Sequence, residues 1–237
     1  MSAWKAKRFW KETKAAEVEG GFSVLLDGRN VKTPAKTPLV VPTLAMAQAI
    51  ATEWDAQEGE VQPLTMPVMR GANAALDKVS NQFDEVAAML AEYGATDLLC
   101  YRADSPQELI QRQAAAWDPI LDWAADALGA RLNSAQGVMF VPQDTATLQN
   151  LHDRVRRMTS FELAAFHDLV GISGSLILGF AAVRDHLPIE AIWDLSRLDE
   201  TWQAEQWGVD DEAAELAASK REEFLRAKRF YELCQAV

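Results

Sequence analysis

The local pattern of this sequence changes once, near Pro42, and that change limits the folds that the chain can adopt. Before Pro42, short strand-like runs alternate with turn residues, at positions 8–11, 16–18, 22–26, 30–32 and 39–41. Asp27-Gly28 falls between two of these runs, where glycine supplies the positive φ of a tight hairpin turn. We therefore expect Asp27 and Gly28 to have a structural role in a small antiparallel β unit.

Beyond Pro42 the apolar residues recur with the period of a helix. Thr43 is a suitable N-cap for a first helix that runs to Trp54. Further helices are predicted at 73–93, 106–128, 145–169, 175–184, 189–206 and 210–233, with one short strand at 138–141. The remainder of the chain is therefore expected to be mainly helical.

These patterns predict an α+β fold, in which a small N-terminal antiparallel β domain is followed by a larger, mainly α-helical domain. The expected domains are residues 1–65, β-rich with a transition helix, and residues 66–237, α-helical. Residues 63–69 are apolar and bounded by prolines, which predicts an irregular segment packed across the junction. Trp54 extends the apolar face of the first helix, and we expect it to have a structural, interdomain role.

The charge of the chain restricts its partners. A net charge of −12 disfavours nonspecific binding to nucleic acid or to an anionic membrane, because phosphate binding requires a dense basic face. Residues 1–36 contain 8 Lys/Arg against 4 Asp/Glu, whereas the rest of the chain contains 15 against 31. A neutral or basic partner is therefore expected.

The cysteines and the apolar runs indicate the compartment. Cys100 and Cys234 are far apart and lack metal-ligand spacing, as expected in a reducing compartment. The longest apolar run, at 176–183, is too short to span a bilayer. We therefore expect a soluble compartment and no membrane insertion.

No segment predicts a catalytic centre, a metal site or a cofactor site. The three histidines show no pairing at a spacing of four residues. Residues 171–175 resemble a nucleophile elbow, but Ser175 replaces the final glycine, so a glycine-containing helix cap is favoured. Gly20-Gly21 precedes a strand, whereas a phosphate-binding loop follows one. We assign no catalytic residue and predict neither a metal nor a cofactor.

Residues 196–208 combine two tryptophans with three carboxylates, which are common ingredients of a protein-recognition surface. On a helix, Leu195, Leu198 and Trp202 share one face, and Glu205 continues that line. A carboxylate on an apolar stripe requires a partner. For Trp207-Gly208 two interpretations stay open: a helix C-terminus with tryptophan packed over the turn, or a surface that also contacts a partner.

Six motifs together carry a family resemblance. The chain resembles the assembly chaperones of the F-type ATP synthase alpha subunit at residues 22–34, 39–43, 53–57, 63–67, 96–102 and 198–208. The resemblance implies an ATP-independent chaperone that binds the free alpha subunit transiently, until the beta subunit displaces it. It also implies a monomer when free, in the bacterial cytoplasm, because no transit peptide of a mitochondrial-matrix relative is recognised.

The resemblance also gives the partner-binding residues. We expect Glu200 and Glu205 to make ionic contacts with the client, and Trp202 and Trp207 to provide apolar anchoring. Two rival functions stay open: an acid/base hydrolase that uses Asp199, Glu200 or Glu205 in an interdomain cleft, and a helical adaptor for another complex.

Overall fold

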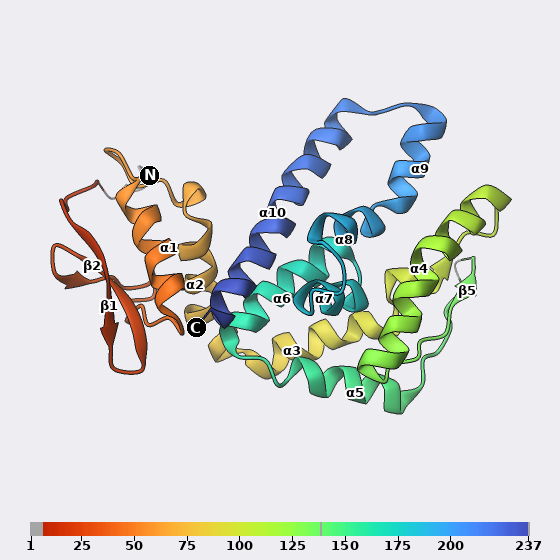
Figure 1. Cartoon of the computed structure of the whole chain (residues 1–237), viewed down its shortest axis with the longest axis horizontal. Coiled ribbons are helices and arrows are strands. Elements are labelled where there is room, and N and C mark those ends of the chain that lie inside the picture. The colour runs from red at the N-terminus through yellow and green to blue at the C-terminus, as the bar shows by residue number, and fades with distance from the viewer. Residues whose placement is uncertain (1–6, 138, 237) are drawn as a thin grey trace. The chain divides into compact units, whose positions relative to one another are not determined.

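The computed structural model describes residues 7–137 and 139–236, which pack into two compact units (Figure 1). The first unit contains the described residues within Met1–Phe83, Thr159–Ala165 and Arg229–Val237, and the second contains those within Asp84–Met158 and Phe166–Lys228. The expected fold class, a small antiparallel sheet followed by a mainly helical region, is confirmed. The division into domains at 1–65 and 66–237 stays a prediction, because compact packing is a different property from independent folding.

The sheet of the first unit has three antiparallel strands in the order β1 (Thr13–Val18), β2 (Gly21–Leu26) and β3 (Arg29–Asn30). Its β2–β3 turn has positive φ at both central residues, 47° at Asp27 and 78° at Gly28, as a type I′ hairpin turn requires. The hairpin predicted at this dipeptide is therefore confirmed.

The strand predictions on either side of this hairpin were partly wrong. Residues 8–11 lie in no strand, and residues 39–41 contribute only an isolated bridge between Phe22 and Val41. The Arg8 backbone N–H instead donates to the carbonyl of Gly59, 2.7 Å away. Trp10 and Leu39 of these runs are buried, and burial of apolar side chains explains their strand-like composition.

Helix α1 (Leu44–Asp55) packs against β1 and β2. Its predicted N-cap is confirmed, because Thr43 Oγ1 accepts a hydrogen bond of 3.1 Å from the backbone N–H of Met46. Met46 and Ile50 of the helix and Val24 of β2 are fully buried in one apolar core. This core holds the helix on the sheet.

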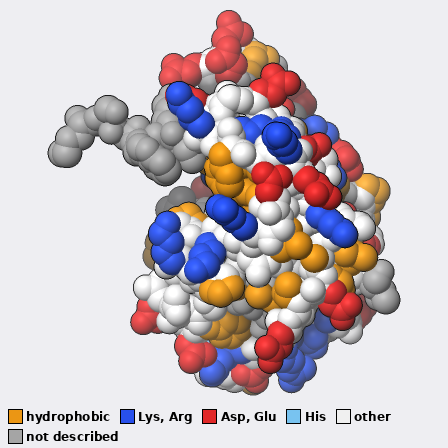
Figure 2. All heavy atoms as spheres, turned by 90° about the vertical axis from the view of Figure 1, so that its left-hand side faces the viewer, with side chains coloured by type: hydrophobic (Ala, Val, Ile, Leu, Met, Phe, Trp, Pro, Cys, Tyr) orange, Lys and Arg blue, Asp and Glu red, His pale blue; other side chains and the backbone are white. Residues whose placement is uncertain are grey.

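Figure 2 views the molecule from the left-hand side of Figure 1, where the sheet lies. Lysine and arginine side chains are interspersed there with acidic and apolar ones. The excess of basic residues in the first 36 positions therefore does not make this face uniformly basic.

The proline-bounded segment is more helical than predicted. After a short 3₁₀ turn, η1 (Pro63–Thr65), helix α2 (Pro67–Asp77) begins at Pro67 itself. Proline is tolerated at the first helical position, because the N–H that it lacks would have no partner within the helix. The expectation that all of residues 63–69 would be irregular was therefore wrong.

The second unit is built mainly from helices. Its central helix, α7 (Leu176–Val183), is buried along residues 176–182. The one predicted strand near residue 140 was misplaced: the parallel pair is β4 with β5, residues 139–141 form no strand, and Val138 lies outside the described residues. The elements after α2, some of which are shared with the first unit, are η2 (Val79–Asn81), α3 (Phe83–Glu92), η3 (Tyr93–Ala95), η4 (Leu98–Cys100), β4 (Tyr101–Arg102), α4 (Gln107–Leu128), β5 (Ala135–Gln136), α5 (Thr145–Val155), α6 (Ser160–Ser173), α7 (Leu176–Val183), α8 (Ile189–Ser196), α9 (Leu198–Trp207) and α10 (Asp211–Gln235).

Three predicted helices are each divided in the structure. The helix predicted at 73–93 is interrupted by η2, where Ser80 Oγ and Asn81 Nδ2 donate to backbone carbonyls of the preceding turn. The helix predicted at 145–169 is divided between α5 and α6 by a capping box: the Thr159 N–H donates to the Glu162 carboxylate, and the Glu162 N–H donates to Thr159 Oγ1. The helix predicted at 189–206 is interrupted at Arg197, which has φ −112° and ψ 14°.

A buried carboxylate fixes the start of α7. Asp97 is fully buried and accepts hydrogen bonds from the Ser175 hydroxyl at 2.7 Å and from the Ile177 N–H at 3.0 Å. Burial raises the pKa of Asp97 to about 6, although these hydrogen bonds act in the opposite direction. Ser175 is the N-cap of α7, which confirms that residues 171–175 lead into a helix cap. No helix within the described part of the chain is long and apolar enough to cross a membrane.

Candidate functional site on helices α4 and α9

Helix α9 carries the four residues that were predicted to bind a partner. Leu198, at its first position, is buried, whereas Trp202 is half-buried. Because the helix is interrupted at Arg197, Leu195 belongs to α8 and does not continue the face of α9. The predicted apolar stripe is therefore shorter than expected.

Glu205 has its partner within the chain. Its two carboxylate oxygens accept hydrogen bonds from Arg112 of α4, at 2.5 Å from Nη1 to Oε2 and 2.9 Å from Nη2 to Oε1. This pair lowers the pKa of Glu205, chiefly through the hydrogen bond from Arg112. The same guanidinium lies over the ring of Trp202, 5.8 Å from its centroid. Arg112 thus connects α4 to both residues of α9.

A buried glutamine gives α9 a second connection. Gln113, which is 1% exposed, donates from Nε2 to Asp199 Oδ1 at 2.7 Å and accepts from the Ala103 N–H at 2.8 Å. Asp199 is therefore fixed as an acceptor at the first turn of α9. Sequence reasoning missed Gln113 and Arg112, since polar residues on an exposed-looking helix give no local sign of a distant partner.

Glu200 is paired locally. Its carboxylate lies 2.8 Å from Arg197 Nη1, in a pair three residues apart, and its side chain is 49% exposed. Such a surface pair holds a side chain loosely and leaves its remaining lone pairs open to a partner.

Trp207 is the most exposed large hydrophobic side chain among the described residues, at 79%. It is the last residue of α9, and Gly208 follows with φ 94°, as expected for a glycine that ends a helix. The helix-terminus interpretation is therefore right for Gly208, but Trp207 is not packed over the turn.

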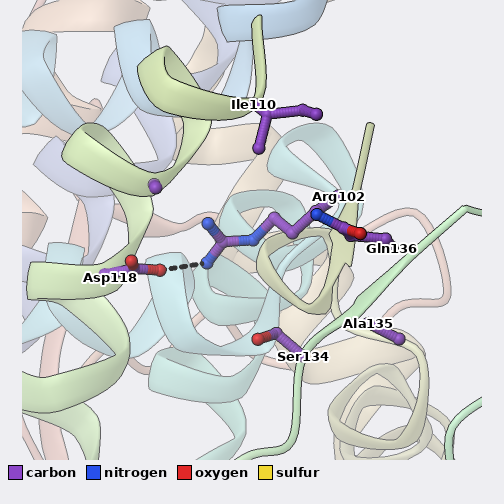
Figure 3. Close-up of a pocket in the computed structure, with 7 residues that line it drawn as sticks. Arg102, Ile110, Asp118, Ser134, Ala135 and Gln136 are labelled. Carbon is purple, nitrogen blue, oxygen red and sulfur yellow. Dashed lines mark ion pairs between the residues drawn. The ribbon is translucent and has the colours of Figure 1, made fainter. Parts of the chain in front are cut away.

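Two small pockets lie beside α4. The first, of about 210 Å³, is lined by Arg102, Asp118 and Ser134 among others (Figure 3). Arg102 Nη2 lies 2.8 Å from Asp118 Oδ1, at an angle outside that of a hydrogen bond, and its Nε donates to the Leu99 carbonyl. The Arg102 guanidinium thus has an ion-pair partner, Asp118, and a hydrogen-bond acceptor, the Leu99 carbonyl, within the chain itself.

The second pocket, of about 360 Å³, extends to α9 and is lined in part by Asp104, Gln113, Asp199 and Gln203. Its volume is near the lower end of the range for small-molecule sites. The described residues contain no group of three or more His, Cys, Asp or Glu side chains arranged to hold a metal ion.

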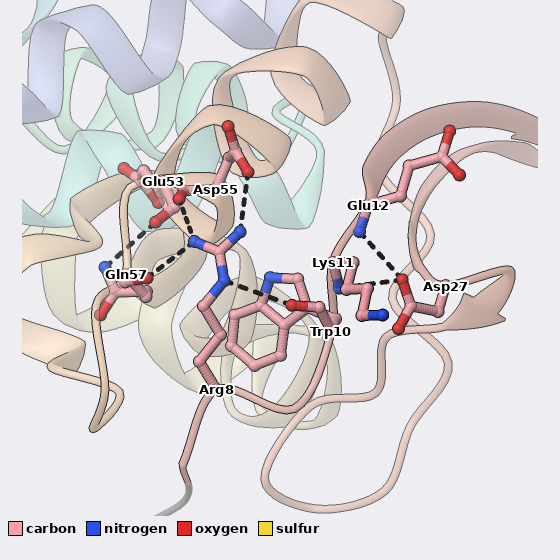
Figure 4. A network of polar contacts seen from close by, with 8 residues as sticks. All are labelled: Arg8, Trp10, Lys11, Glu12, Asp27, Glu53, Asp55 and Gln57. Atoms are coloured by element: carbon pink, nitrogen blue, oxygen red, sulfur yellow. Dashed lines mark hydrogen bonds and ion pairs between the residues drawn. The ribbon is translucent and has the colours of Figure 1, made fainter.

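Asp27 in the first unit has a structural role in the hairpin (Figure 4). Its Oδ1 accepts hydrogen bonds from the N–H groups of Lys11 and Glu12, at 3.0 and 2.9 Å. These backbone hydrogen bonds lower the pKa of Asp27. They tie the start of β1 to the β2–β3 turn.

Trp54 packs against Trp10, with ring centroids 5.0 Å apart in an edge-to-face arrangement. Trp10 is 3% exposed, and both residues belong to the first unit. The interdomain part of the role expected for Trp54 stays a prediction.

The residues on either side of Trp54 organise the next segment. Both carboxylate oxygens of Glu53 accept from the first N–H groups of α2, at 2.7 Å from Val68 and 2.8 Å from Met69. Gln57, 3% exposed, donates to Thr65 Oγ1 and accepts from the Gln62 N–H. Arg8 donates to the Gln57 carbonyl and pairs with Asp55 (Figure 4). The 53–57 motif is therefore explained by the fold of the first unit.

A family model described as ATP12 chaperone protein matches residues 7–125, just over half of the chain. The chain belongs to the ATP12 chaperone family. Atp12 from Paracoccus denitrificans has a solved structure that is 49% identical in sequence, with a TM-score of 0.95 over 98% of this chain and 100% of that one. The Atu1473 protein of Agrobacterium tumefaciens is 42% identical, with a TM-score of 0.91 over 95% of this chain and 85% of that one.

A curated relative is more distant. The mitochondrial protein atp12 of Schizosaccharomyces pombe is 28% identical over 223 residues, which cover 89% of this chain and 76% of that protein. Membership of the ATP12 family makes the chain a chaperone rather than an enzyme and supports a role in ATP synthase assembly. The hydrolase alternative is set aside on this family membership.

Proposed function

We propose that this ATP12-family chaperone binds the free alpha subunit of the ATP synthase catalytic head without using ATP. It holds that subunit until the beta subunit takes its place. The observation that carries the proposal is the ATP12 family match over residues 7–125, together with the similarity to the solved Paracoccus structure over 98% of the chain. An unpaired subunit exposes a large interface that would otherwise aggregate, and a temporary partner can cover it.

The geometry of α9 supports its use as the client-binding element. Arg112 and Gln113 of α4 hold the helix at Glu205 and at Asp199, so the helix is ordered before any partner arrives. Preorganisation reduces the conformational entropy that binding must overcome. Trp207 then offers a large exposed apolar side chain, and tryptophan is among the residues most enriched at interface hot spots.

The carboxylates around Trp207 fit a contact that can be reversed. Glu200 and Glu205 are about half-exposed, and each can accept a further hydrogen bond from a lysine or arginine of the client. Charged contacts at the rim of an interface contribute more to specificity and association rate than to affinity. An interface of modest affinity suits a chaperone that the beta subunit must displace.

We also propose that the chaperone acts as a monomer in the cytoplasm of a bacterium. The solved relatives come from the bacteria Paracoccus denitrificans and Agrobacterium tumefaciens, whereas the Schizosaccharomyces pombe relative is named as mitochondrial. Sedimentation of the purified chain tests the monomeric state, and fractionation of the source cells tests the compartment.

A capture experiment with separately expressed subunits tests whether the alpha subunit is the client. The tagged chaperone is incubated without nucleotide with purified alpha subunit, with purified beta subunit, or with both. We expect capture of alpha alone and its loss when beta is added in excess. Capture of beta but not alpha, or a requirement for ATP, would contradict the proposal.

A further inference from the structure

The first ten residues of α10 extend beyond the packed part of the second unit. Between positions 211 and 220 every side chain is exposed except that of Ala217, which is half-buried. Figure 1 shows this part of α10 joined to α9 by the short connection 208–210. Val209 in the connection is 70% exposed and Leu216 on the helix is 58% exposed, close in sequence to the exposed Trp207.

These exposed residues continue a face that is buried later in the same helix. Phe224 is fully buried, with its ring 5.8 Å from that of Trp193, and Ala227 is 5% exposed. Ala213 precedes Phe224 by about three turns, and Leu216 precedes Ala227 by the same distance. Ala217 precedes Phe224 by about two turns. These residues therefore lie in line with the buried residues. The apolar face of α10 begins about three turns before the protein covers it.

Acidic residues surround the exposed part of this face. Residues 198–223 contain nine Asp or Glu against two Lys or Arg. Asp210 caps the helix by accepting from the Ala213 N–H. Within the part of the chain that the structure describes, Asp211, Glu212 and Glu215 form no ion pair. Glu200, Glu205 and Glu222 are paired with arginines, so the negative charge that is not neutralised lies at the start of α10.

We propose that the exposed part of α10, together with Trp207 and Val209, docks a segment of the client that presents apolar side chains flanked by lysine or arginine. This rests on the proposed function, since the client is the free alpha subunit. An apolar patch rimmed by charge is typical of a protein-interaction site. The negative rim selects a segment of opposite charge and accelerates the encounter. A second copy of this chain does not fit, because two such acidic faces would repel each other.

A single substitution on the exposed face tests the docking surface. Leu216→Asp places a further charge on the face without disturbing a buried contact, and Leu64→Asp is its matched control, since Leu64 is 77% exposed on η1 of the first unit. We expect Leu216→Asp to weaken alpha-subunit binding about tenfold or more, with an unchanged thermal melt, and Leu64→Asp to leave binding unchanged.

Charge reversal tests the chemistry of the occupant. Glu215→Lys lies beyond the first turn of α10, so its effect on the helix dipole is small, and Glu58→Lys in an exposed loop is the control. We expect Glu215→Lys to slow association with the alpha subunit and to weaken its dependence on salt. A photoreactive side chain at position 216 identifies the occupant, and the crosslinked alpha peptides are expected to contain apolar residues beside lysine or arginine.

The outcomes separate this inference from the proposed function. If the wild-type chain does not bind the alpha subunit, the proposed function fails. If it binds and Leu216→Asp binds equally well, the function stands and the docking surface is wrong. If the crosslinks join two copies of the chaperone, or reach only acidic alpha peptides, the occupant proposed here is wrong.

Discussion

Arg112 of α4 and Glu205 of α9 lie 93 residues apart and form a two-point ion pair on the surface of the second unit. Their side chains are 37% and 47% exposed, so the pair orients α9 but contributes little to the stability of the fold. Because the carboxylate is still accessible, it can meet a client while it is held by Arg112. The pair thus presents Glu205 in a fixed position.

We predict that Glu205→Lys abolishes capture of the alpha subunit while the melting temperature stays within about 3 °C of the wild type. Lysine repels both Arg112 and a basic client. Arg112→Gln is the comparison variant, because it removes the pair but keeps the carboxylate, and it should weaken capture without abolishing it. Equal loss in both variants would mean that the pair itself, rather than contact with the client, is required.

Trp207→Ala is expected to weaken binding of the alpha subunit about tenfold or more without destabilising the chaperone. The side chain is 79% exposed, so its truncation leaves no cavity. Titration calorimetry measures the affinity, and Phe9→Ala is a matched control, since Phe9 is 68% exposed in the first unit. An unchanged affinity for Trp207→Ala would exclude this residue as an anchor.

Trp54→Ala should behave in the opposite way. Its ring packs against Trp10, and its loss is expected to reduce the free energy of unfolding by about 2–4 kcal/mol. Urea denaturation measures this change, and Trp54→Phe, which keeps an aromatic ring, should lose less. A change below about 0.5 kcal/mol, as for an ordinary surface substitution, would show that Trp54 has no structural role.

Asp97 makes stability depend on pH in a defined direction. Its pKa is about 6 in the fold against 3.8 as the reference value, so the folded state binds this proton more tightly. The stabilisation that comes from this tighter proton binding is complete below about pH 4 and is lost as the pH rises through about 6. The shift corresponds to roughly 3 kcal/mol.

Asp97→Asn isolates this effect, because asparagine does not titrate. We expect the free energy of unfolding of the wild type, relative to that of Asp97→Asn, to fall by about 2–3 kcal/mol between about pH 4 and pH 7. Urea denaturation of both proteins across this range measures the difference, in which the contributions of the other carboxylates cancel. A constant difference, or one that grows with pH, would contradict the assigned pKa.

The elements that could be predicted from the sequence are those fixed by local chemistry. The turn at Asp27-Gly28 requires positive φ, and Thr43 caps α1 with its own side chain. The Thr159–Glu162 pair also has the sequence pattern of a capping box, which marks the start of a helix. The apolar residues keep their helical period across this point, so a single helix was predicted instead.

The candidate site was harder to predict because its geometry depends on distant residues. Asp199 and Glu205 were recognised on α9, but their partners on α4 are 86 and 93 residues away, and no local pattern pairs them. The exposure of Trp207 could not be predicted either, because a tryptophan before a helix-ending glycine can be packed or exposed. Tertiary packing decides between these alternatives.

Static light scattering of free ATP synthase alpha subunit, diluted from denaturant without nucleotide, tests the central claim most directly. We predict that an equimolar amount of this chaperone suppresses the aggregation of alpha, and that the same amount of the Glu205→Lys variant does not. Aggregation at the same rate with and without the wild-type chaperone would contradict the account.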